Sequence, residues 1–276
     1  MLNVLFAVLI LALLGLLLGG LIGFTAKKFA VESDSRIEKI TELLPGANCG
    51  GCGYAGCADY ARAIVEDGVS PANCAAVTDE NFQEILKTAG RDAVQRERKV
   101  AVVYCSGDNS HAVHVALYNG LNDCRAAASL SGAGKGCRFG CIGLGSCARS
   151  CQFGAIELRN GLAVVHPELC RGCGTCTEVC PRKLIRLVPA DSKVHVFCNS
   201  LDKGPLKRRF CSAGCLACRK CVNSSPELFN VQGFLVRARS GADLTEDQVA
   251  AIRCPTGALQ TVEMHLKRAK GEDKAV

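Results

Sequence analysis

The chain has 276 residues, 20 of them cysteines, and a formal net charge of +7 at pH 7. This charge is too mild to indicate nucleic-acid binding, and no aromatic side chains interleave the basic residues, since aromatics make up only 5%. Secreted disulfide scaffolds are also cysteine-rich, but they are short. Here the cysteines fall in tight groups, which favours metal ligation. Bound metal would also supply folding free energy to small, aromatic-poor domains.

An uncharged segment opens the sequence at residues 2–24, and two lysines follow it. As a helix rising about 1.5 Å per residue it would span about 35 Å, enough for a hydrocarbon core of about 30 Å. It lacks the basic start and short apolar core of a signal peptide. We therefore predict a transmembrane anchor over residues 1–26, with the following domains cytoplasmic by the positive-inside rule. Gly15, Gly19 and Gly23 recur at every fourth position. This stripe favours packing against helices of other membrane subunits, and the alternative is a single anchor that tolerates glycine.

The segment 27–98 is expected to be a small, mainly helical four-cysteine domain with linker helices. Its cysteines follow the spacing C-x2-C-x4-C-x16-C and are Cys49, Cys52, Cys57 and Cys74. The glycines between them let backbone amides turn toward the sulfurs of a cluster. Four thiolates suit a [4Fe–4S] cluster or a zinc ion. Residues 79–98 are highly charged and indicate a solvated helix or linker.

From residue 99 onward the sequence contains an internal repeat. KVAVVYC, which ends at Cys105, resembles KVHVFC, which ends at Cys198, and CRFGC (137–141) matches CSAGC (211–215). We therefore expect ferredoxin-like units. The predicted fold is α+β, and its domains are an anchor (1–26), a helical domain (27–98), a two-cluster domain (99–190) and a single-cluster domain (191–276).

A second repeated element joins a cysteine to a short apolar run, which we interpret as the start of a helix. Three copies begin at Cys151, Cys180 and Cys254, and a fourth begins at Ser225, where the cysteine has been lost.

The strongest motif is C-x2-C-x2-C-x3-C-P, formed by Cys170, Cys173, Cys176, Cys180 and Pro181. In bacterial ferredoxins the first three thiolates hold one cubane and the fourth reaches its neighbour. The neighbouring half has Leu144 where a ligand belongs, and Cys137 is the obvious replacement. The prediction is therefore one cluster on Cys137, Cys141, Cys147 and Cys180. A second cluster is predicted on Cys151, Cys170, Cys173 and Cys176.

A further cluster is predicted on Cys215, Cys218, Cys221 and Cys254, with Cys211 as a rival for the last position. Four sets use 16 cysteines. The others are Cys105, Cys124, Cys198 and Cys211, either as buried apolar thiols or as spare ligands.

Basic residues crowd the start of the last unit: Lys203, Lys207, Arg208, Arg209, Arg219 and Lys220. They indicate either a docking face for an acidic ferredoxin or an ordinary solvated face. SGADLT (240–245) has Asp243 at the threonine position of a covalent-flavin motif, so no flavin is expected on this chain.

Taken together, these motifs resemble the B subunits of the Rnf complex, the ion-translocating ferredoxin:NAD oxidoreductase. The resemblance rests on NCGGCGYAGC (48–57) with Cys74, CRFGCIGLGSC (137–147) and CRGCGTCTEVCP (170–181). It implies an iron–sulfur subunit that relays single electrons between soluble ferredoxin and membrane partner subunits, with no complete active site of its own. It also implies coupling of this flow to Na⁺ or H⁺ movement by the whole complex.

Two other hypotheses stay open at this point. The first is an iron–sulfur subunit of another membrane oxidoreductase, and the second is a membrane-tethered zinc-binding module.

Overall fold

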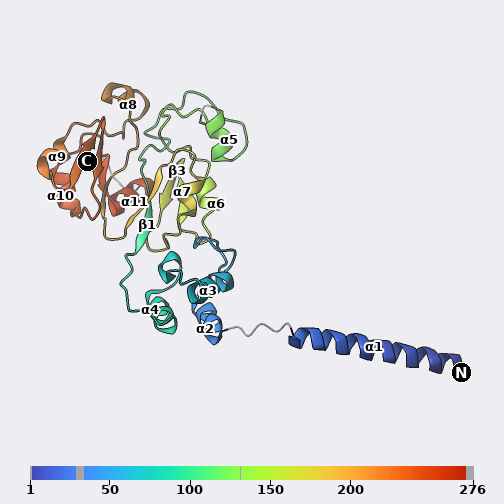
Figure 1. Cartoon of the computed structure of the whole chain (residues 1–276). Helices are drawn as coiled ribbons and strands as arrows, with labels where there is room; N and C mark the ends of the chain where they lie inside the picture. The colour runs from blue at the N-terminus through green and yellow to red at the C-terminus, as the bar shows by residue number, and fades with distance from the viewer. Residues whose placement is uncertain (1, 29–33, 131, 272–276) are drawn as a thin grey trace.

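The computed structural model describes residues 2–28, 34–130 and 132–271, and in the first of these segments the side chains of residues 6, 9–10 and 12–25. Helix α1 (Leu2–Lys28) extends away from the folded body in Figure 1, and its described apolar side chains are exposed. Within the described part of the chain, no helix has both the length and the apolar character that crossing a membrane requires. The predicted transmembrane anchor over residues 1–26 is therefore not supported.

A small helical domain follows, with α2 (Ser35–Leu43), α3 (Cys57–Glu66), the 3-10 helix η1 (Pro71–Asn73) and α4 (Asp79–Thr88). The helices begin at side-chain caps where the sequence offers them: Thr78 Oγ1 accepts a hydrogen bond from Asn81 N at the start of α4. Each helix turns one apolar face inward. The buried side chains that form this core include Ile40, Tyr60, Ile64, Phe82 and Ile85.

The charged segment 79–98 is helical only as far as Thr88, and it is not solvated on all sides. The helix ends because Gly90 adopts the left-handed conformation, with φ of +69°. Arg96 then folds back, and its Nη1 donates a hydrogen bond to the carbonyl oxygen of Cys74 at 2.7 Å. The segment therefore packs against the loop that carries Cys74, the last cysteine of the helical domain.

The rest of the body consists of two units with the same strand plan. In the first, β1 (Lys99–Val103) pairs with β4 (Ile185–Pro189), and β2 (Ile156–Arg159) pairs with β3 (Leu162–Val165). In the second, β5 (Val194–Val196) pairs with β8 (Leu259–Thr261), and β6 (Phe229–Gln232) pairs with β7 (Leu235–Ala238). All four pairs are antiparallel. The sequence repeat is thus a structural repeat, in which the outer strands of each unit pair around a central hairpin.

Short helices connect these strands. They are α5 (Cys124–Ser129), α6 (Ser146–Arg149), α7 (Thr175–Val179), α8 (Gly204–Phe210), α9 (Lys220–Ser224), α10 (Glu246–Ala251) and α11 (Val262–Lys270). The described chain is therefore a mixed α and β protein.

The four copies of the repeated element that begins at Cys151, Cys180, Ser225 and Cys254 lead into strands β2, β4, β6 and β8, so the predicted helix starts are wrong. Each copy forms one tight turn, in which the fourth residue donates its N–H to the carbonyl of the first, at 3.1–3.3 Å. In three copies this fourth residue is in the left-handed region: Gly154, Lys183 and Gly257. Such a residue ends helical backbone after one turn. The apolar residues beyond it then pair with a neighbouring strand.

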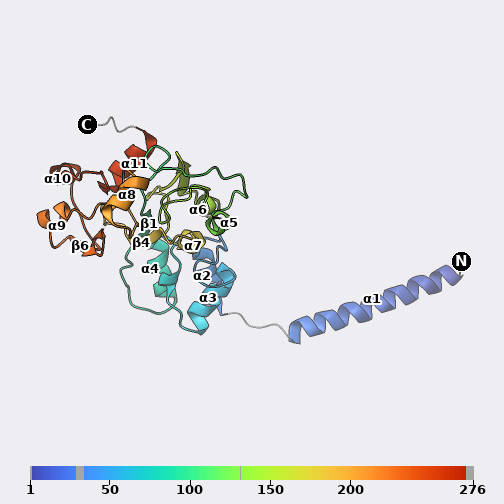
Figure 2. The ribbon, with the colours of Figure 1, turned by 90° about the horizontal axis from the view of Figure 1, so that it is seen from above.

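The two units share part of their core. Val102 and Tyr104 of the first unit pack with Phe197 of the second. The ring of Phe197 stacks on His265 of α11, with 3.8 Å between ring centroids, and α11 also contacts β3 of the first unit. Figures 1 and 2 accordingly show one continuous body above the helical domain. The domain boundary predicted between residues 190 and 191 stays a prediction.

The helical domain should open independently of the two strand units, and Ile85→Ala tests this. Ile85 is fully buried in the helical core, so truncation should lower the free energy of local opening by about 2–5 kcal/mol. Hydrogen exchange measured by mass spectrometry on the whole protein should show faster exchange in α2–α4.

Val236→Ala, at a buried position of β7, is the matched control, and it should speed exchange in β5–β8 instead. Equal acceleration everywhere in both variants would contradict independent opening.

Candidate metal-cluster sites

All 20 cysteines lie within the described residues, and none of them forms a disulfide. Reduced thiols are the form in which cysteine ligates metals. The cysteines are not spread evenly over the fold. They gather in groups of four.

The first group lines a cavity in the helical domain and consists of Cys49, Cys52, Cys57 and Cys74. The loop is held in place by Asn48, whose Oδ1 accepts a hydrogen bond from Cys57 N at 2.8 Å, at the start of α3. Burial raises the pKa of the Cys74 thiol, and the neighbouring Cys52 and Cys49 thiols raise it further. The structure therefore brings together the four residues that the spacing predicted.

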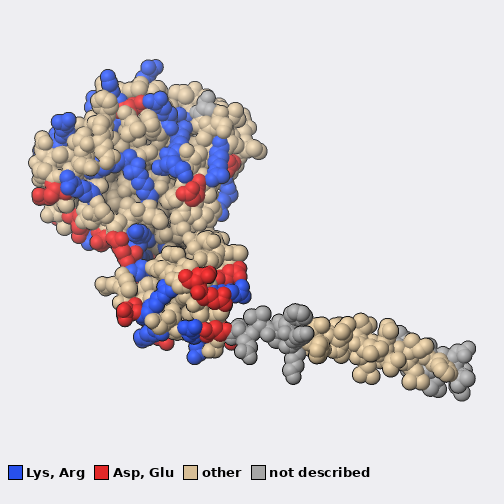
Figure 3. Space-filling view, in the orientation of Figure 1, with Lys and Arg blue, Asp and Glu red and all other residues tan. Residues whose placement is uncertain are grey.

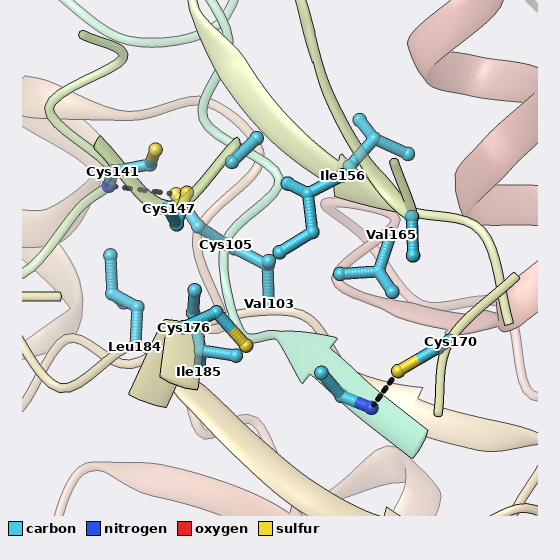
Figure 4. Close-up of a cluster of buried hydrophobic side chains, with 14 of the residues drawn as sticks. Val103, Cys105, Cys141, Cys147, Ile156, Val165, Cys170, Cys176, Leu184 and Ile185 are labelled. Carbon is cyan, nitrogen blue, oxygen red and sulfur yellow. Dashed lines mark hydrogen bonds between the residues drawn. The ribbon is translucent and has the colours of Figure 1, made fainter. Parts of the chain in front are cut away.

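The second group belongs to the ferredoxin motif and consists of Cys151, Cys170, Cys173 and Cys176. Burial raises the pKa of the Cys176 thiol to about 12, and the Cys170, Cys173 and Cys151 thiols raise it further. The backbone N–H of Ala101 in β1 donates to Cys170 Sγ at 3.3 Å, one of the dashed lines in Figure 4. These four residues also match the predicted set.

The first and second groups are adjacent. Cys173 lines the cavity of the helical domain together with the first group. A Cβ atom placed on Gly51 would lie 3.3 Å from Cβ of Cys173, so the two loops touch and the glycine permits the approach. The helical domain is thus joined to the first strand unit at its cysteine loop.

The third group differs from the predicted one. Its cavity is lined by Cys124, Cys141, Cys147 and Cys180. Burial raises the pKa of the Cys147 thiol to about 12, and Cys141, Cys124 and Cys180 contribute to the rise. Cys137 lines a different cavity. Cys124 therefore occupies the position that the sequence pattern assigned to Cys137.

Cys124 is held in this group by a short chain of hydrogen bonds. Its N–H donates to Ser146 Oγ at 2.8 Å, and Ser146 Oγ donates to Asp123 Oδ2 at 2.9 Å. These bonds tie the start of α5 to the start of α6, which carries Cys147. The sequence signal was the helix cap Asp123 directly before a cysteine. The known cysteine spacings do not link Cys124 to Cys141, Cys147 and Cys180, so this signal alone could not assign it to the third group.

The fourth group lines a cavity in the second strand unit and consists of Cys215, Cys218, Cys221 and Cys254. Burial raises the pKa of the Cys221 thiol to about 11, and Cys215 and Cys254 raise it further. The rival ligand Cys211 does not line this cavity. The structure thus groups Cys254, which lies far along the sequence, with the three-cysteine run.

The remaining four cysteines also share a cavity, which is lined by Cys105, Cys137, Cys198 and Cys211. Burial raises the pKa of the Cys211 thiol to about 12, and the other three thiols add to this rise. Three of these residues were expected to be isolated buried thiols or spare ligands. The repeated segments that end at Cys105 and Cys198 were the available signal for this grouping.

The donor atoms and surroundings of the groups fit iron–sulfur clusters. Thiolates are soft ligands that favour Fe–S clusters, zinc and copper(I). Within the described residues, no three His, Cys, Asp or Glu side chains are placed to hold a single metal ion. The sulfurs of a cubane are farther apart than the ligands of one ion, because each binds a different iron. Backbone amides also point at sulfurs, as in the 3.4 Å hydrogen bond from Leu184 N to Cys180 Sγ, a contact that tunes cluster potential.

Repeated ferredoxin-like strand units with cysteines in groups of four define an iron–sulfur protein. A family model described as "Putative Fe-S cluster" matches residues 44–76, and a model described as "4Fe-4S dicluster domain" matches residues 137–184. Both matches fall on these cysteine groups.

Similarity to characterised proteins extends over most of the chain. It is 38% identical to the B subunit of the ion-translocating oxidoreductase complex of Methanosarcina acetivorans, over 79% of this chain and 83% of that protein. It is 37% identical to the B subunit of the proton-translocating ferredoxin:NAD(+) oxidoreductase complex of Clostridium ljungdahlii, over 94% and 93%. It is 41% identical to the Na(+)-translocating counterpart of Acetobacterium woodii, over 75% of this chain and 62% of that protein. The chain therefore belongs to the family of B subunits of Rnf-type ion-translocating oxidoreductase complexes.

Proposed function

We propose that this chain relays single electrons between a soluble ferredoxin and the membrane subunits of an ion-translocating ferredoxin:NAD oxidoreductase. The observation that carries the proposal is the gathering of cysteines into adjacent groups of four in a member of this family. The ion moved by the complex would be Na⁺ or H⁺, as the names of the relatives from the two bacteria illustrate.

At least four [4Fe–4S] clusters are proposed. Their ligands are Cys49, Cys52, Cys57 and Cys74; Cys151, Cys170, Cys173 and Cys176; Cys124, Cys141, Cys147 and Cys180; and Cys215, Cys218, Cys221 and Cys254. When bound, such clusters accept and release one electron at a time. The chain's own contribution is to bind them, exclude water and direct N–H groups at the sulfurs. No catalytic residue is assigned to it, and the chemistry on NAD would take place on another subunit.

Attachment to the membrane complex is proposed to run through α1. Its described apolar side chains are exposed. Gly15, Gly19 and Gly23 have no other atom within 4 Å of a Cβ placed on them, so a partner helix could approach closely along this stripe. The cluster-bearing domains are proposed to lie on the cytoplasmic side of the complex.

The face that receives electrons is proposed to lie beside the fourth group. Cys218 is exposed, whereas the other 19 cysteines are buried or partly buried. Arg219 and Lys220, directly after it, are exposed as well. Arg208 and Arg209 of α8 are also exposed, and Figure 3 shows Lys and Arg gathered over this upper part of the body. An acidic ferredoxin would be steered to such a surface by charge.

Lys207 is a correction to the predicted basic face. Its side chain is buried, and its Nζ donates hydrogen bonds to the carbonyl oxygens of Cys215, at 2.9 Å, and Phe234. Lys207 is therefore unavailable to a docking partner.

Reduction by ferredoxin tests the proposed function directly. Anaerobically purified protein should be brown, and reduced ferredoxin should bleach its visible absorption and produce the EPR signals of reduced cubanes. A colourless, zinc-containing protein would contradict the proposal and favour a zinc-binding module.

The assignment of Cys124 can be tested by iron analysis. Cys124→Ala and Cys147→Ala should each lose about four iron atoms per chain, because each removes a ligand of the same cubane. The double variant should lose no more than either single variant. Ala126→Ser, on the same helix, is the control and should keep all its iron. Full iron content in Cys124→Ala would show that another residue completes this cluster.

The docking face can be tested with Arg208→Glu/Arg209→Glu. Reversing two exposed charges should slow electron transfer from ferredoxin about tenfold at low salt and weaken its salt dependence. Stopped-flow absorption measures both effects. Lys39→Glu/Lys87→Glu makes the same charge change on exposed positions of α2 and α4 and should leave the rate nearly unchanged. An equal effect of both double variants would count against a specific docking face.

A further inference from the structure

The cavity lined by Cys105, Cys137, Cys198 and Cys211 lies at the junction of the two strand units, and each unit supplies two of its cysteines. Cys105 follows β1 and Cys198 follows β5, and each donates its N–H to the carbonyl two residues earlier at 2.8 Å. The two residues thus leave their strands through the same local turn. The other two come from the matching segments CRFGC and CSAGC. The cavity is therefore built by the repeat, with equivalent residues from both copies.

Backbone pairing across the junction holds this arrangement. Val113 N donates to Phe210 O at 2.9 Å, and Ser212 N donates to His111 O at 2.9 Å. Ala112 forms a β-bridge with Cys211 between these two bonds. A segment of the first unit therefore fixes the position of a cysteine of the second.

Two backbone N–H groups point at the sulfur of Cys105. Gly107 N donates to Cys105 Sγ at 3.4 Å, and Cys141 N donates to the same sulfur at 3.3 Å, as the second dashed line in Figure 4 shows. A Cβ on Gly107 would lie 3.3 Å from Cys211 Sγ and 3.6 Å from Cys105 Sγ. The glycine thus leaves room between two of the four sulfurs.

Two buried lysines line the same cavity, and this indicates that it holds negative charge. Lys135 and Lys207 are each 3% exposed. Lys135 Nζ donates to Gly107 O at 2.6 Å, and Lys207 Nζ donates to the carbonyl oxygens of Cys215 and Phe234. Neither forms an ion pair with a carboxylate among the described residues. Buried ammonium groups are costly unless a negative charge balances them. A cubane with four thiolates carries net negative charge.

The spacing of the four cysteines places the cavity between two proposed clusters. In the ferredoxin motif, cysteines separated by three residues bind neighbouring cubanes. Cys137 and Cys141 have this spacing, and so do Cys211 and Cys215. Cys141 belongs to the third group and Cys215 to the fourth. The junction cavity is therefore separated from the third group, and from the fourth group, by one pair of cysteines with this spacing.

We propose that Cys105, Cys137, Cys198 and Cys211 hold a fifth [4Fe–4S] cluster, which connects the clusters of the first strand unit to the cluster of the second. This inference rests on the proposed electron-relay function and deepens it. Every cysteine of the chain then has a role, in five sets of four.

Iron, sulfide and electron counts on the full-length protein test the proposal. The wild type should hold about 20 iron atoms and take up about five electrons per chain, and Cys198→Ala should hold about 16 and take up about four. Cys105→Ala/Cys198→Ala should lose no more than Cys198→Ala alone. Cys198→Ala/Cys254→Ala should lose about eight iron atoms, since the two residues serve different clusters. Ser200→Ala, which alters a hydroxyl lining the same cavity, is the control and should keep all its iron.

About 16 iron atoms in the wild type, with no further loss in Cys198→Ala, would overturn the fifth cluster and leave the proposed function intact. A wild type without iron would overturn both. If Cys198→Ala loses more than four iron atoms, the wild-type count decides: about 20 supports the fifth cluster and about 16 overturns it.

Discussion

The arrangement of loops and strands depends on one requirement, which is that four sulfurs must meet around each cavity. Without metal, burial raises the thiol pKa, to about 12 for Cys147 and Cys176, so these side chains are neutral and pack as small apolar groups. Metal binding must then displace their protons, which couples cluster assembly to folding. Cys141, Cys147, Cys170 and Cys176 lie in one core with the valines and leucines of the strands. The core and the sites are therefore the same part of the structure, and small units with few aromatic residues can be stable.

The repeated tight turn explains how short strands supply this geometry. A turn closed by its fourth residue places the cysteine on one side and starts a strand on the other, and the strand is fixed by its antiparallel partner. A ligand at this position is held by backbone pairing. The copy at Ser225 keeps the turn and leads into β6 without a thiol. The turn thus contributes to the fold independently of its cysteine, which is why the second unit can lose a ligand position and keep its strand plan.

Local spacing allowed the prediction of the groups whose cysteines lie within one or two turns of each other. The run Cys170–Cys176 and the run Cys215–Cys221 are of this kind. Cys124 and Cys137 could not be assigned in the same way, because their neighbours are set by the path of a long connection and by pairing between units. The strands after the tight turns were missed because short apolar runs have no clear periodicity. Lys207 was placed on the surface because it stands in a basic run, yet α8 turns this one side chain inward.

Lysine and arginine therefore act in two different environments of the same protein. On the surface, Arg208 and Arg209 are screened by salt and can influence only the encounter with a partner. In the wall of the junction cavity, Lys135 and Lys207 are shielded from water, so their charge acts strongly on whatever occupies the cavity. Positive charge near a cluster favours its reduced, more negative state. A cluster at the junction would accept electrons more readily than one surrounded only by apolar groups. The position of two side chains would thus help to set the potential of a cluster at the junction.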